Sequence, residues 1–307
     1  MRDFDMKKVF CRLVIVTCVI GTFTLTGCDK SEVEFTDGFW LKMGDNSIVS
    51  TSNIDFYDVS THMIYLKKDL PYFEKIKKNY GGTMSVYVDG DEIYKCAFHS
   101  SYLSSLPNGE YISCNPTFYP EYIIRINFLQ IIDLNGNPQF TDHRSDERII
   151  AALKKNQLYH EGLCCEIQSF NYLEGKLVLN IVLSNSDTFD YYYLDPDKMG
   201  FELFHYFTNG ATFWSIQHTQ SYTHQETVIH PEPWDSWNNE WLSLIKSGER
   251  KDISIIYDHF DMMPAGNYRM YFEFPGLNYG ISQKDLILKD GRIWMGSIGI
   301  EKDVTIH

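Results

Sequence analysis

The 307-residue chain has few basic residues for its length. Lysine and arginine number 27, against 41 aspartates and glutamates, so the formal net charge is −14. Nucleic-acid binding relies on basic side chains that displace the counterions of the phosphate backbone. The acidic balance and the lack of a basic patch in the sequence therefore exclude nucleic acid as an expected partner.

The sequence also lacks the short motifs that mark common enzyme classes. It has no P-loop, no dinucleotide-binding glycine pattern and no Gly-x-Ser-x-Gly elbow. His160-Glu161 begins like the zinc-protease pattern His-Glu-x-x-His, but Cys164 stands at the fifth position and Gly162 interrupts the helix that would carry both ligands. We therefore expect a protein that is not an enzyme and holds no cofactor.

Long apolar runs are absent after the N-terminal segment. Lys7, Lys8 and Arg12 give this segment a positive start, and the apolar stretch 9–23 is shorter than the roughly 20 residues of a spanning helix. A positive start, a short apolar run and small residues before a cleavage point are typical of a secretory signal. The sequence therefore predicts an exported protein.

The residues that end this segment, Leu25-Thr26-Gly27-Cys28, resemble the lipobox of bacterial lipoproteins. The resemblance implies cleavage before Cys28 and lipid chains on its thiol and new amino group, and an ordinary signal peptide is the alternative. Each buried CH₂ contributes about 0.8 kcal/mol, so a multiply acylated Cys28 would anchor the protein stably. We expect a signal peptide at 1–27, a tether at 28–34 and the membrane as a partner.

The tether and the aromatic-rich composition bear on which membrane holds the anchor. The tether begins Cys28-Asp29-Lys30-Ser31-Glu32-Val33-Glu34. In enterobacterial lipoproteins an aspartate after the cysteine suggests inner-membrane retention, whereas in Bacteroidota-like lipoproteins acidic residues here accompany export to the outer surface. The many Tyr, Phe and Asn residues favour the second interpretation, which implies a surface-exposed protein of the outer membrane in the cell envelope.

The composition also predicts the fold class. Aromatic residues make up 15% of the chain, with 21 Tyr and 20 Phe, and these residues favour strands over helices. We predict a mostly β fold of two β-sandwich-like units, a β-rich domain at 35–145 and a second unit at 163–307, joined by one connecting helix at 146–162. Ser145 is the expected helix cap and Gly162 the expected stop.

The second unit carries one family resemblance. Pro264-Ala265-Gly266-Asn267-Tyr268-Arg269 is similar to the entry of a late strand in bacterial immunoglobulin-like domains. The resemblance implies an immunoglobulin-like sandwich of about seven strands, although the paired core cysteines of antibody domains are absent. The strands are expected at 177–183, 189–194, 201–207, 211–217, 253–257, 268–274 and 293–300, with Asn209-Gly210 as a hairpin turn.

Four cysteines follow Cys28 in the chain. Cys96 and Cys114 could form a disulfide across a hairpin in an oxidising compartment, or both could be buried free thiols. Cys164 and Cys165 are adjacent in the sequence, so a bond between them would be strained.

Two groups of residues have metal-ligating chemistry. His218, His224 and His230 recur every six residues with His205 nearby, a spacing that does not fit one helix face. Asp190, Asp195 and Asp197 could hold Ca²⁺ in an edge loop, together with Asp187. A solvated loop would also explain the histidines, and a plain turn around Pro196 would also explain the aspartates. We therefore expect no metal and retain the three aspartates as candidate calcium ligands.

Three tryptophans form the candidate ligand platform. Trp234, Trp237 and Trp241 would form one stripe on a short helix, because they lie at i, i+3 and i+7. Large rigid aromatics suit a stacking site for sugar rings or for a partner protein, and the alternative is a helical cap that closes one end of the sandwich.

The predicted function is a lipid-anchored envelope protein with a non-enzymatic binding or scaffolding role, whose partner is an envelope protein or a glycan. One alternative is a glycan-binding accessory protein of a polysaccharide-uptake system, which would use the three tryptophans. The other is a hydrolase or protease inhibitor whose site forms only in the folded chain, and two carboxylates meeting in a cleft would indicate it.

Overall fold

The computed structural model describes residues 37–44, 47–68, 82–114, 119–133, 137–215, 220–278 and 280–307. The predicted signal peptide at 1–27 and the tether at 28–34 with Cys28 lie outside the described residues. Asp37–His307 form one compact unit. The chain is 48% strand and 11% helix, which confirms the mostly β fold class. Among the described helices, none has the length and apolar character needed to cross a bilayer.

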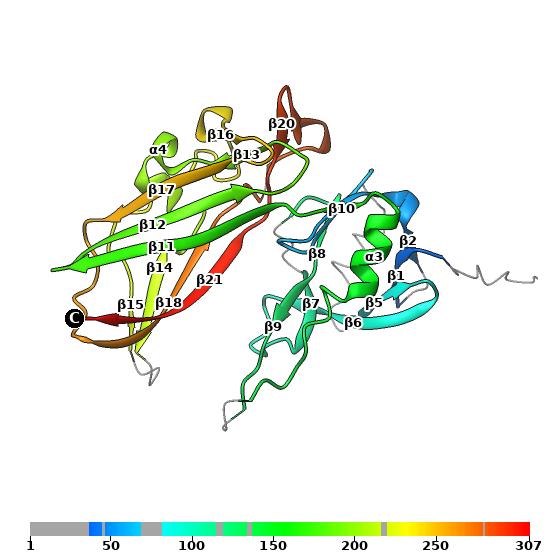
Figure 1. The fold of residues 1–307 in the computed structure, drawn as a ribbon, viewed down its shortest axis with the longest axis horizontal. Helices are drawn as coiled ribbons and strands as arrows, with labels where there is room; N and C mark the ends of the chain where they lie inside the picture. Colours follow the sequence, from blue (N-terminus) through cyan, green and yellow to red (C-terminus); the bar gives the residue numbers. More distant parts are fainter. Residues whose placement is uncertain are drawn as a thin grey trace, which may run out of the picture. The chain divides into compact units, whose positions relative to one another are not determined.

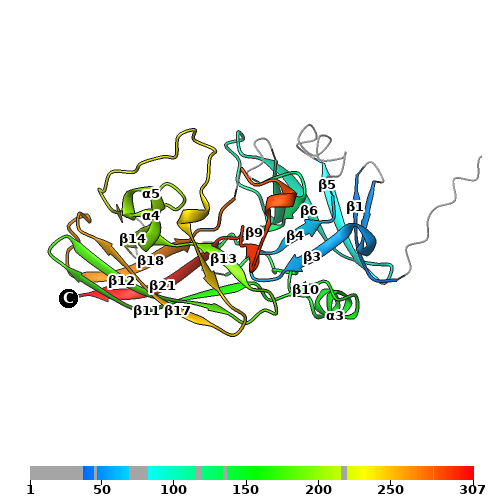
Figure 2. The same ribbon diagram turned by 90° about the horizontal axis from the view of Figure 1, so that it is seen from above.

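The first half of the unit builds two sheets (Figure 1). One has the order β2-β1-β5-β6-β7-β9, and the other has the order β10-β3-β4-β8. Figure 2 shows β3 and β4 side by side, as their antiparallel register requires. The strands and the short 3-10 turn are β1 (Phe39–Met43), β2 (Ile48–Ser50), η1 (Thr51–Asn53), β3 (Ile54–Asp58), β4 (Met63–Leu66), β5 (Thr83–Val88), β6 (Asp91–Ser100), β7 (Gly109–Cys114), β8 (Ile123–Arg125), β9 (Asn127–Leu129) and β10 (Tyr159–His160).

The pairing of β6 with β7 rules out the disulfide that the sequence left open. The two strands run parallel, and Cys114 lies opposite Ser100 rather than Cys96. Four residues of strand separate Cys96 from that position, about 13 Å at the usual rise, whereas a disulfide needs Cα atoms within about 7 Å. Cys96, Cys114, Cys164 and Cys165 are all free.

The one longer helix, α3 (Glu147–Lys155), is shorter than the predicted 146–162. Asp146 caps it by accepting a hydrogen bond from the amide of Arg148, so the expected cap at Ser145 is wrong by one residue. The helix ends at Asn156, and Tyr159–His160 then form β10, which pairs in parallel with β3. Its buried face, Ile149, Ala152 and Leu153, packs on the side of β1 and β5. The helix therefore belongs to the core of the first half.

The second half builds three sheets, with orders β11-β12-β17, β16-β13-β20-β19 and β15-β14-β18-β21. Its elements are β11 (Leu163–Leu173), β12 (Lys176–Asn185), β13 (Tyr191–Leu194), α4 (Pro196–Met199), α5 (Phe201–Phe204), β14 (Ala211–Ser215), β15 (Ser221–Tyr222), η2 (Asn239–Trp241), β16 (Leu242–Ile245), β17 (Arg250–Tyr257), β18 (Gly266–Phe274), η3 (Gln283–Asp285), β19 (Ile287–Leu288), β20 (Gly291–Ile293) and β21 (Ile298–Ile306).

These sheets correct the prediction of two sandwiches, because the described strands divide among five small sheets. The expected strand at 201–207 is wrong: Phe201–Phe204 are helical and bury Phe204, so Asn209-Gly210 does not join two hairpin strands. The expected strand at 293–300 is split between β20 and β21, with Gly296 in the gap. An added Cβ at Gly296 would lie 2.4 Å from the Thr61 side chain, which shows how closely this gap approaches the first half.

The motif that suggested an immunoglobulin-like domain does begin a strand. β18 starts at Gly266, and the Tyr268 hydroxyl donates to the Pro264 carbonyl oxygen at 2.7 Å. A tyrosine hydroxyl that bonds to the backbone a few residues upstream also occurs in the tyrosine corner of immunoglobulin-like sandwiches. The motif therefore predicted the start of a strand correctly, although the sheets around it differ from two packed layers.

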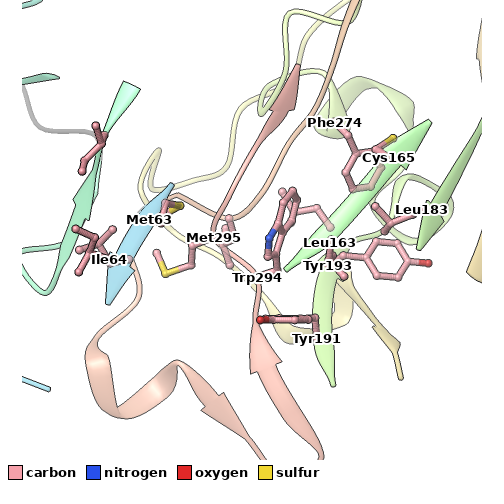
Figure 3. Close-up of a cluster of buried hydrophobic side chains, with 14 of the residues drawn as sticks. Met63, Ile64, Leu163, Cys165, Leu183, Tyr191, Tyr193, Phe274, Trp294 and Met295 are labelled. Carbon is pink, nitrogen blue, oxygen red and sulfur yellow. The ribbon is translucent and has the colours of Figure 1, made fainter. Parts of the chain in front are cut away.

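One buried core runs through both halves (Figure 3). Trp294 and Met295 lie between Met63 and Ile64 of β4 and the second-half residues around Tyr191. The Trp294 indole N–H donates to Asp58 Oδ2 at 3.2 Å, and the Tyr122 hydroxyl donates to the Ile281 carbonyl at 3.1 Å. The core therefore continues across the sequence boundary predicted at 146–162.

Candidate functional site

A cavity of about 230 Å³ opens where residues of the two halves meet. The first half contributes Ser113 of β7, Ile123–Arg125 of β8 and Asn127 of β9, and the second half contributes Glu273 of β18. Ligand sites often form at such junctions, because the two parts can supply different chemistry to one hollow. The remaining lining residues are Ile112, Tyr119, Phe207, Pro275, Gly276, Asn278 and Ser297.

Arg125, the last residue of β8, is held in the wall of this cavity by neutral partners. Its guanidinium donates to the Tyr119 hydroxyl, to Ser297 Oγ at 2.9 Å and to the Ser297 carbonyl oxygen at 3.4 Å. The guanidinium carbon also lies 5.6 Å from the centre of the Tyr119 ring. These contacts orient the planar group without neutralising its charge.

Arg125 is one of two described arginines that form no ion pair with a carboxylate. Arg144, Arg148, Arg269 and Arg292 each form an ion pair with an aspartate. Arg125 is partly buried, and no described carboxylate forms an ion pair with it. Among the described arginines, only Arg250 also has no ion pair, and Arg250 is exposed. Since taking a cation out of water is costly unless an anion compensates, Arg125 is available to bind one.

Two acceptor groups line the same cavity. Glu273 lies on the face of β18 opposite to the buried Phe272 and Phe274, and it forms no ion pair with a described residue. Asn278 Oδ1 is buried and has no hydrogen-bond donor among the described residues. The cavity thus presents the Arg125 guanidinium as a donor. It also presents two oxygen acceptors that receive no hydrogen bond from a described residue.

Electrostatics keep Arg125 charged. Burial by itself would lower its pKa, but Tyr119 and the Glu273 carboxylate favour the cation, and the pKa lies above its ordinary value. The guanidinium is therefore a cation throughout the physiological pH range. Arg125 also acts on Tyr271 of β18: it favours a lower pKa for that hydroxyl, whereas burial raises the pKa to about 12.

The lining residues of the cavity bear on the hydrolase alternative. Glu273 is the one carboxylate among the described lining residues, so the pair of carboxylates that would indicate a hydrolase does not meet here. No motif or spacing in the sequence points to Glu273 or Asn278. The polar position of Arg125 within the alternating segment 122–128 was the one feature that could have drawn attention to it.

The three tryptophans do not form the predicted stripe. Residues 233–241 contain a turn and the short 3-10 segment η2 instead of a helix. Trp237 and Trp241 pack against the core, and the Trp237 indole N–H donates to the Gly280 carbonyl at 3.0 Å. Trp234 alone is largely exposed, at 65% of its surface. The helical geometry that made these residues a platform is therefore absent.

The candidate calcium ligands serve as backbone acceptors. Asp195 caps α4 by accepting from the amide of Asp197, and Asp190 accepts from the amide of Ser247 at 2.7 Å. In the described part of the chain, no three His, Cys, Asp or Glu side chains converge as a metal site. The structure therefore gives Asp190 and Asp195 local structural roles and does not bring the three aspartates together.

Two of the four histidines, the buried His205 and the half-buried His224, form a pair. The rings of His205 and His224 are 4.3 Å apart, whereas His230 is exposed and His218 lies outside the described residues. Neither nitrogen of His205 nor Nδ1 of His224 has a hydrogen-bond partner among the described residues. Burial lowers the pKa of His205 to about 3, with His224 acting in the same direction, so His205 is neutral at pH 7.

His160 and Asp187 make the other polar cluster of note. His160 Nδ1 lies 2.8 Å from Asp187 Oδ1, and the Tyr191 hydroxyl and the amide of Gly162 donate to Asp187 Oδ2. The His160 ring stacks on Phe189 at 3.8 Å. No serine, threonine or cysteine is hydrogen-bonded to the His160 ring within the described ranges, and the dyad links β10 to the loop that follows β12.

No protein-family model matches the chain, and no curated protein matches it in sequence.

Proposed function

We propose that this chain is a lipid-anchored protein of the bacterial envelope that binds a small polar ligand in the cavity around Arg125. The observation that carries the binding role is a partly buried guanidinium, oriented by Tyr119 and Ser297, that no described carboxylate neutralises. The anchor rests on the resemblance of Leu25-Thr26-Gly27-Cys28 to a lipobox. Binding, rather than catalysis, is supported by the single carboxylate in the lining.

A thermal-shift screen of the full-length protein tests the binding role. The library should contain neutral sugars, amines, carboxylates and zwitterions of low molecular mass. We expect at least one compound to raise Tm, because a ligand at 100 times its Kd stabilises the folded state by about 2.7 kcal/mol. The shift should vanish in Ser113→Trp, which places an indole into the lining. A shift of equal size in that variant, or no shift from any compound, would contradict a binding cavity.

The anchor is tested by changing the cysteine of the lipobox. Cys28→Ala should move the protein from the membrane fraction to the soluble fraction, because the lipid chains that supply the membrane affinity can no longer be attached. Cys164→Ala is the matched control, since Cys164 is exposed and lies in β11, and it should leave the distribution unchanged. Tight membrane association of Cys28→Ala would show that another feature holds the protein there.

A further inference from the structure

The charges that line the Arg125 cavity identify a class of ligand. Arg125 lies on β8 of the first half and Glu273 on β18 of the second, and both line the same hollow. They form no ion pair with each other, although the Glu273 carboxylate favours the charged form of Arg125, and neither forms an ion pair with any other described residue. Two opposite charges that face one cavity without touching leave room for a ligand that carries both complementary charges.

We propose that the cavity binds a zwitterion of the α-amino acid type, with its carboxylate at Arg125 and its ammonium group at Glu273. This inference rests on the proposed function, because it names the ligand of the same cavity.

The cavity offers hydrogen-bond partners to both the carboxylate and the ammonium group of such a ligand. Arg125 is already positioned by Tyr119 and Ser297, and a planar guanidinium binds a carboxylate through two parallel hydrogen bonds. An ammonium group has three N–H donors, and the cavity has two unsatisfied acceptors, the Glu273 carboxylate and Asn278 Oδ1. A singly charged ligand would leave one of the two protein charges without a partner, and that desolvation cost disfavours it.

The cavity wall also accommodates a side chain. Ile112, Ile123, Phe207 and Pro275 supply apolar surface next to the polar groups. A volume of about 230 Å³ suits a small molecule rather than a polymer chain. The two charges would therefore fix the orientation of the ligand, and the apolar wall would select among side chains.

The test compares matched sets of compounds by calorimetry on the full-length protein in detergent. One set is L-phenylalanine, 3-phenylpropionate and 2-phenylethylamine, which share a ring and differ in charge. The other sets are L-leucine and L-alanine with their own deaminated and decarboxylated analogues. We expect at least one zwitterion to bind about tenfold or more tightly than both of its singly charged analogues.

Variants locate the two charges. Arg125→Gln should weaken binding of that zwitterion by about 30-fold or more, since removing one partner of a desolvated charge pair has an effect of this size, and Glu273→Gln should weaken it by about tenfold. Arg250→Gln and Glu301→Gln remove one exposed charge of each sign elsewhere and should leave affinity unchanged. If Arg125→Gln fails to fold, Arg125→Lys replaces it, and the loss of the two-pronged hydrogen bond should still weaken binding about tenfold.

Three results would overturn the assignment. The first is equal binding of a carboxylate that lacks the amine, with Glu273→Gln without effect. The second is binding of a neutral sugar in place of every zwitterion. The third is that none of the three amino acids binds. The first two results leave the binding function of the cavity intact, and after the third the wider thermal-shift screen decides whether that function stands.

Discussion

Trp294→Ala is expected to lower the free energy of unfolding by about 3–5 kcal/mol, the range for truncating a fully buried tryptophan. Trp294 is 1% exposed and lies between β4 and the residues around Tyr191 (Figure 3). Its loss would leave a cavity where the two halves share their core. It would also remove the indole N–H that donates to Asp58 Oδ2, an acceptor that is itself buried. Equilibrium unfolding in urea measures the effect.

Two tryptophan variants serve as controls for this result. Trp294→Phe keeps an aromatic ring in the core and should lose clearly less stability, mainly through the missing hydrogen bond to Asp58. Trp234→Ala removes an exposed ring and should change stability by no more than about 0.5 kcal/mol. If Trp294→Ala were as mild as Trp234→Ala, the two halves would not share a core at this point.

His205→Leu should make the protein less sensitive to acid. In the unfolded chain a histidine takes up its proton near pH 6.5, whereas in the folded protein burial delays protonation of His205 to about pH 3. The folded state therefore loses stability as the pH falls through this window. Between pH 7.5 and 5.0 the loss from His205 is about 2 kcal/mol, and the leucine variant should not show it. The measurement is urea unfolding of both proteins at the two pH values.

The comparison is designed so that the contribution of a second buried histidine cancels. Burial also lowers the pKa of His62 to about 3, but His62 is present in both proteins and contributes equally to each. His230→Leu is the matched control for the change of histidine to leucine, because His230 is exposed. Equal losses of stability in the His205→Leu variant and in the original protein between pH 7.5 and 5.0 would show that His205 takes up its proton in the folded state.

The elements that the sequence predicted well are those with a local cause. The alternation of apolar residues in 177–183 is a local signal, and β12 forms where the alternation occurs. The strand that follows Pro264 and Gly266 also forms where the motif indicated. The strand expected at 201–207 failed because its aromatic residues suit a buried helix as well as a strand, and periodicity over so few residues cannot separate the two.

The pairing of strands and the site could not be predicted in the same way. β6 and β7 read as a hairpin pair along the sequence, yet they run parallel, and that one difference separates Cys96 from Cys114. The cavity joins Arg125 to Glu273, which lie far apart in the sequence, and neither belongs to a motif. The helix expected to carry the three tryptophans is absent, because their regular spacing does not by itself produce a helix.

The contacts between the C-terminal segment and the first strands have a consequence for biosynthesis. The side-chain amide of Gln283 donates to the carbonyl oxygen of Leu66, 217 residues earlier, and Arg292 pairs with Asp55. A ribosome adds roughly 5–20 residues per second, so roughly 10 to 40 seconds pass between synthesis of β4 and of the segment that covers it. Throughout that interval Met63 and Ile64 lack the Trp294–Met295 segment that buries them. The nascent chain is therefore expected to need a holding chaperone, and to complete its fold only when its last strands emerge.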